Sequence, residues 1–141
     1  MIDPMTNLPN RRAVQRILNQ VNENKEYPVG VLLVDIEGLE NIRSLLGQTV
    51  IEHVLIEILY HISKELSGDQ LVAYWQAGQF ICVCPGLEQG DVETLKKRFE
   101  AISINKDKLL GQPLKFSCAA SSVYNKAELE NLFTELEDQL I

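Results

Sequence analysis

The chain has 141 residues, a length that fits one domain with a single hydrophobic core. Hydrophobic residues make up 45% of it and charged residues 23%, which excludes disordered and fibrous classes. The formal net charge of −7 argues against nucleic acid and anionic membrane surfaces as partners.

The first half of the chain predicts three helices around one strand. Asn10 can cap a helix whose apolar residues recur with a 3.6-residue period and which ends before Pro28. The nearly continuous apolar run Val29–Ile36 is typical of a central strand that is buried on both faces. A short helix over Leu39–Leu46 and a longer one over Val50–Leu66 follow, and the second carries one apolar stripe.

The second half predicts a hairpin, a helix, a strand and a last helix. Leu71–Trp75 and Phe80–Cys84 are short β-rich runs, and the four residues between them include a glycine, as a hairpin turn requires. A helix is expected over Asp91–Ile104, a strand over Leu114–Val123 and an amphipathic helix over Ala127–Leu140.

This order of elements predicts an α+β fold of the ferredoxin-like type. The core reads β-α-α-β-β-α-β, with one helix before it and one after it. Such a core forms a central antiparallel sheet, and we expect its helices on one face of the sheet.

The cysteines and the apolar runs limit the chemistry and the compartment. Cys82, Cys84 and Cys118 cannot all pair, and we expect reduced thiols in the core. The apolar run Val29–Val34 is far shorter than the ~20 residues that span a bilayer, so we expect no membrane insertion of this fragment and a cytoplasmic location.

Two segments resemble a known family. The opening DPMTNLPNRR (residues 3–12) is similar to the D-x-L-T-G-L-P-N-R-R motif of GGDEF domains, bacterial diguanylate cyclases that join two GTP molecules into cyclic di-GMP. Val34-Asp35-Ile36-Glu37 resembles the D-x-D that ends the family's first strand. The resemblance implies the palm-like fold of nucleotide cyclases and one degenerate GGDEF domain over residues 1–141, excised from a longer multidomain protein.

The family's signature is altered in this chain. Aligned on Phe80, residues 76–80 read QAGQF where the family has GGDEF or GGEEF. The resemblance implies that Mg²⁺ would be held by Asp35 and by the residue at Gly78, which offers no ligand. Because phosphoryl transfer depends on such cations, we expect no diguanylate cyclase activity, no metal and no cofactor. Glu37 shares the face of Asp35 on a regular strand, so the two acids are either a vestigial cation site or a solvated strand end.

The positions that contact the nucleotide in the family are altered as well. The guanine-binding asparagine falls on Arg43, which has no hydrogen-bond acceptor, and the phosphate-facing lysine falls on Glu40. Glu52 falls on the family's second guanine-binding acid and retains an acceptor. We therefore group Asp35, Glu37 and Glu52 as a vestigial metal or nucleotide site.

The altered hairpin is a candidate interaction surface made of Trp75, Gln76, Ala77, Gly78 and Gln79. Uncharged residues cost less free energy to desolvate than the acids they replace, and an aromatic side chain is a common anchor in protein contacts. For Trp75 itself, packing in the core is the favoured interpretation, and contact with a partner is the second.

Three functions therefore stay open from the sequence. The favoured one is a catalytically inactive module for protein interaction or dimerisation in bacterial signalling or regulation. The second is a module that senses GTP or a related nucleotide without turnover, and the third is an enzyme with residual or changed activity. A protein partner or a homodimer is expected, and nucleic acid is not.

Overall fold

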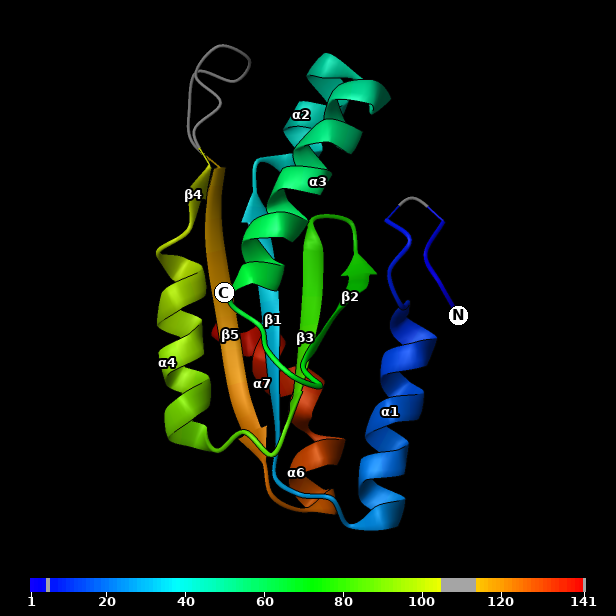
Figure 1. Ribbon diagram of the computed structural model, residues 1–141, viewed down its shortest axis with the longest axis vertical. Coiled ribbons are helices and arrows are strands. Elements are labelled where there is room, and N and C mark those ends of the chain that lie inside the picture. The colour runs from blue at the N-terminus through cyan, green and yellow to red at the C-terminus, as the bar shows by residue number, and fades with distance from the viewer. Residues whose placement is uncertain (5, 105–113, 141) are drawn as a thin grey trace.

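The computed structural model describes residues 1–4, 6–104 and 114–140, so Met5 of the opening motif lies outside the described residues. Its strands form one antiparallel sheet in the order β2-β3-β1-β5-β4 (Figure 1). The strands are β1 (Val29–Glu37), β2 (Leu71–Gln76), β3 (Gln79–Pro85), β4 (Ser103–Ile104) and β5 (Leu114–Val123). The helices are α1 (Arg11–Asn24), α2 (Leu39–Leu46), α3 (Gln48–Lys64), α4 (Gln89–Glu100), α6 (Lys126–Glu130) and α7 (Leu132–Gln139).

The central strand β1 divides the core into two layers. Its even-numbered residues, such as Leu32 and Val34, pack under α2, α3 and α4. Its odd-numbered residues, such as Val31 and Leu33, pack against α1 and α7. Successive side chains of a strand point to opposite faces, which is why this run is apolar at nearly every position.

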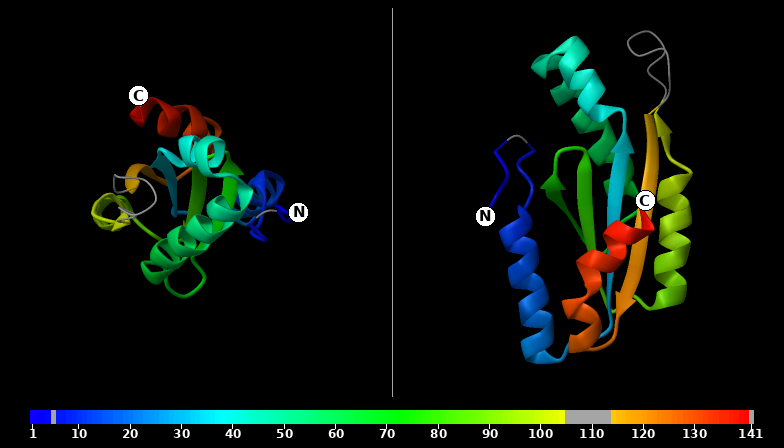
Figure 2. Two further views of the ribbon diagram at one scale, coloured as in Figure 1. Left: turned by 90° about the horizontal axis from the view of Figure 1, so that it is seen from above. Right: turned by 180° about the vertical axis from the view of Figure 1, so that it is seen from behind.

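The expectation of helices on one face of the sheet is wrong. Figure 2 shows helices on both sides, and the two apolar clusters assign α1 and α7 to the face opposite α3. The reason is the uninterrupted apolar character of β1 and β3, which leaves two faces to be covered.

Two predicted helices differ from the observed ones. The helix expected to reach Ile104 ends at Glu100, and Ser103–Ile104 instead pairs with β5 as the edge strand β4. The last helix is divided at Asn131, where the backbone leaves helical geometry at ψ 0 and the side chain donates to the Ala127 carbonyl. Asparagine is a weak helix former because its side chain competes for backbone groups.

The N-terminal segment is attached to the edge of the sheet. Asp3 accepts hydrogen bonds from the backbone and the hydroxyl of Thr6, at 2.8 and 2.7 Å, which closes a turn. Asn10 caps α1 by accepting from Ala13 N, as predicted. Between them, the Pro9 carbonyl accepts from Tyr74 N at 2.9 Å, so this segment covers part of β2.

The three cysteines are free and buried, which confirms the prediction of core thiols. Burial raises the pKa of Cys84 and of Cys118 to about 12, and it also raises the pKa of Cys82 well above its ordinary value. Within the described residues, we find no helix with the length and apolar character needed to span a bilayer.

Candidate functional site

The hairpin between β2 and β3 turns at Ala77 and Gly78. Gln76 faces Gln79 across the turn, and the pairing is irregular beside it, between Tyr74 and Gln76. Gly78 has a φ of +75°, a backbone conformation that L side chains rarely adopt, and its carbonyl accepts from Ile36 N at 2.8 Å. The signature position aligned with a metal-binding acid therefore lies in a tight turn that favours glycine.

Asp35 lies next to this hairpin, near the end of β1. Its cross-strand neighbours are Gln79 on β3 and Ser117 on β5. The Gln79 amide nitrogen donates to Asp35 Oδ1 at 3.3 Å, and the Gln76 amide nitrogen donates to Gln79 Oε1 at 2.7 Å. Two neutral amides thus form a hydrogen-bonded chain that ends on Asp35. Neither amide supplies a carboxylate beside it.

Glu37 lies two residues beyond Asp35 and faces the same side of the sheet, as predicted. Its carboxylate accepts a hydrogen bond from the Ser117 hydroxyl at 3.1 Å, and its side chain is exposed. Among the residues that the structure describes, no three His, Cys, Asp or Glu side chains come close enough together to hold a metal ion.

Glu52 lies on a different element from these two acids. It is exposed on α3, which packs on the even-numbered face of β1, and its carboxylate accepts from Gln48 one turn earlier at 3.5 Å. Asp35 and Glu37 lie at odd-numbered positions of β1. Asp35 and Glu37 thus share one face of β1, whereas Glu52 belongs to a helix that packs on the other face.

Charges from two segments surround Tyr74 beside the hairpin. Arg43 and Glu40 form a loose ion pair on α2 at 4.0 Å. Burial raises the pKa of Tyr74, the carboxylates of Asp3 and Glu40 raise it further, and the Arg43 guanidinium opposes them. Two carboxylates and one guanidinium therefore act on the Tyr74 hydroxyl.

Trp75 is not on the exposed side of the hairpin. Its side chain is only 5% exposed and belongs to the cluster under α1 and α7. The Phe133 ring stacks on it with centroids 4.6 Å apart, and the Arg11 guanidinium carbon lies 3.9 Å from its ring centroid. This placement confirms core packing for Trp75 and removes it from the candidate interaction surface.

The other four residues of the candidate interaction surface differ in how exposed they are. Gln76 and Ala77 are exposed, Gln79 is partly buried and Gly78 is buried. Sequence reasoning missed Ser117 as a partner of the acids, because nothing in its neighbourhood distinguishes it until the register of β1 and β5 is known.

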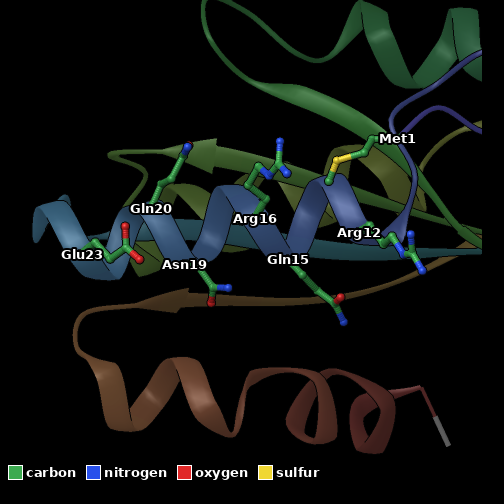
Figure 3. A pocket seen from close by; sticks show the side chains of 7 residues that line it. All are labelled: Met1, Arg12, Gln15, Arg16, Asn19, Gln20 and Glu23. Atoms are coloured by element: carbon green, nitrogen blue, oxygen red, sulfur yellow. The ribbon is translucent and has the colours of Figure 1, made fainter.

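A separate hollow of about 560 Å³ lies along the outer side of α1 (Figure 3). The residues that line it are Met1, Arg12, Gln15, Arg16, Asn19, Gln20 and Glu23. None of them belongs to β1 or to the hairpin, so this hollow is distinct from the region around Asp35.

Comparison with known families and proteins gives a consistent result. The family model described as "Diguanylate cyclase, GGDEF domain" matches residues 1–139. The chain is 28% identical over 107 residues to the uncharacterized protein sll1895 of Synechocystis, covering 71% of this chain and 15% of that protein. It is 29% identical over 125 residues to the diguanylate cyclase DgcP of Pseudomonas aeruginosa, covering 85% of this chain and 18% of that protein. The chain thus spans less than a fifth of the length of these relatives.

Solved structures share the fold. The diguanylate cyclase SiaD of Pseudomonas aeruginosa, in complex with its activator SiaC, superposes with a TM-score of 0.78 at 19% identity, over 99% of this chain and 56% of that one. The FimX GGDEF domain from the same organism superposes with a TM-score of 0.75 at 16% identity, over 97% of this chain and 89% of that one.

Proposed function

The chain belongs to the GGDEF family of diguanylate cyclase domains, and on that premise we propose that it is a catalytically inactive member that acts by protein interaction or dimerisation in bacterial signalling or regulation. We place it in the cytoplasm, as a domain of a longer protein. Its predicted palm-like α+β fold is the one its structural neighbours share.

The observation that carries the proposal is the amide chain on Asp35. Mg²⁺ prefers several hard oxygen ligands in octahedral geometry, and two-metal phosphoryl transfer needs carboxylates that hold the ions beside the reacting oxygens. Here the side chain across from Asp35 is Gln79, which donates an N–H to it. A donor in that place satisfies the carboxylate and supplies no negative charge, so these residues do not fit a Mg²⁺ pair.

The absence of charged side chains from the hairpin turn supports an interaction role. Gln76 and Ala77 are exposed and uncharged, and Gly78 and Gln79 complete a rim without an ionised side chain. Such a rim costs less to desolvate against another protein than a rim of carboxylates would. Trp75 is not the anchor for that contact, because its ring packs against Phe133 and Arg11.

Calorimetric titration of the chain with GTP, ATP and cyclic di-GMP in the presence of Mg²⁺ tests the proposal. We expect no binding heat with any of the three. Micromolar GTP binding that Asp35→Asn abolishes would contradict the proposal and favour a nucleotide-sensing module. The matched control is Glu137→Gln on α7, which removes the same charge from an exposed position on another element.

A further inference from the structure

Helix α3 carries two large apolar side chains on its outer face. Ile56 is 69% exposed and Tyr60 is 62% exposed. They lie four residues apart, so they are neighbours on one ridge of the helix. The view from above in Figure 2 shows α3, coloured teal to green, as an outer layer of the molecule.

The outer ridge is directed away from the sheet. At about 100° per residue, the midpoint of Ile56 and Tyr60 lies roughly 160° from the centre of the buried stripe of α3. That stripe consists of Ile51, Val54, Leu55, Ile58 and Ile62. Core packing therefore does not explain the two exposed side chains.

Charges of opposite sign extend the same ridge at its two ends. Glu52 lies four residues before Ile56, and Lys64 lies four residues after Tyr60, and both are exposed. The Lys64 ammonium lies 5.6 Å from the Tyr60 ring centroid, which places the charge beside the apolar pair. The ridge thus reads acid, apolar, apolar, base, at equal spacing.

We propose that this ridge, residues 52, 56, 60 and 64 of α3, is a self-association surface on which a second copy of the chain packs in antiparallel orientation. A two-fold axis midway between residues 56 and 60 brings each residue opposite its complement. Ile56 then meets the partner's Tyr60, and Glu52 meets the partner's Lys64, each contact occurring twice.

Charge complementarity selects this occupant and this orientation. A parallel arrangement would set like charges against each other at both ends of the ridge, which is unfavourable. The antiparallel arrangement also puts His53 opposite the partner's Ser63, two groups that can share a hydrogen bond. Because the contact rests on one helical ridge, it belongs to the class of small, reversible interfaces.

The inference builds on the proposed interaction role and gives it a surface and a partner. It does not involve the hairpin and does not depend on whether the domain is catalytically active. Nucleotide binding or cyclic di-GMP synthesis would overturn the proposed function and leave this inference standing. A chain that stays monomeric would overturn this inference and leave the proposed function standing.

Sedimentation velocity of the 141-residue chain over a concentration series is the test. The parent chain is expected to show a sedimentation coefficient that rises with concentration. Glu52→Lys and Lys64→Glu, tested separately, are each expected to weaken self-association about tenfold, because the end charges then repel across the interface. The control Glu137→Lys changes the net charge as Glu52→Lys does, at an exposed position of α7, and is expected to behave as the parent.

Mixing the two charge variants gives the decisive result. In a mixed pair, all four end positions meet an opposite charge, so the mixture is expected to associate as strongly as the parent although neither variant does so alone. All substituted residues are exposed, and circular dichroism checks that each variant is folded. A monomeric parent, or a mixture no stronger than its components, overturns the inference. Self-association abolished by Ala77→Glu but not by Tyr60→Ser would overturn it in favour of the hairpin.

Discussion

Replacing Trp75 with alanine tests whether this residue is a core element or a contact for a partner. The indole is 5% exposed, so its removal leaves a cavity among α1, β2 and α7. We expect the free energy of unfolding to fall by about 3–5 kcal/mol, a range that large-to-small aromatic substitutions in cores typically give. The stacking on Phe133 contributes about 0.5–1.5 kcal/mol of this, and the Arg11 contact about 0.5–1 kcal/mol. A domain with 5–15 kcal/mol in total (about the usual range) would be severely weakened.

Trp75→Phe separates the packing from the polar group. The indole N–H is buried and has no hydrogen-bond partner within the part of the chain that the structure describes. A buried donor without a partner costs free energy, so phenylalanine retains the stacking and removes that penalty, and the loss should be clearly smaller than for alanine. Urea unfolding followed by far-UV circular dichroism measures both variants, since Trp75 is the only tryptophan and its fluorescence disappears with it. A loss below about 1 kcal/mol for Trp75→Ala would refute its placement in the core.

Four further predictions concern the turn, the thiols and the outer side of β5. Gly78→Asp should yield no cyclic di-GMP and should lower the unfolding free energy by about 1 kcal/mol in urea titrations, because φ is +75° there; an active or unaffected variant would contradict this. Cys84 and Cys118, with pKa values near 12, should resist a thiol reagent until the chain unfolds. Since the unfolded thiols lose their protons near pH 9.0, stability should be constant below that pH and fall as the pH rises toward 12, and a flat profile would count against burial of the protonated thiols. Gln139→Ala should increase aggregation measured by light scattering, because the Gln139 amide hydrogen-bonds both the N–H and the carbonyl of Ala120 on the side of β5 that faces away from β1. Unchanged light scattering would contradict this protective role of Gln139.

The sequence was sufficient for the elements whose pattern is local. The run Val29–Ile36 could be recognised as a central strand because both of its faces are apolar, and its observed bounds are Val29–Glu37. The alternation of Ile102 and Ile104 was hidden at the end of a helical pattern, so β4 was missed. Amphipathic helices reveal that one side is buried but not which face of the sheet buries it, so the position of α1 could not be foreseen.

The site depended on contacts that only the register of the strands defines. Asp35 and Gln79 are 44 positions apart, and their hydrogen bond follows from the pairing of β1 with β3. Trp75 faces the same side of the sheet as Ala73, by the ordinary alternation of a strand, but only the assembled fold shows that α1 and α7 bury that side. Neither property can be read from a motif.

Product analysis after incubation with GTP and Mg²⁺ tests the central claim most directly. The chain is incubated for a long period at high concentration, and the nucleotides are separated by chromatography beside a blank and a variant with Asp35→Ala. We predict no cyclic di-GMP above the blank from either protein, because Gly78 supplies no second carboxylate and Asp35 accepts a hydrogen bond from the neutral Gln79 amide. Cyclic di-GMP that forms with the parent chain and disappears with Asp35→Ala would contradict the account.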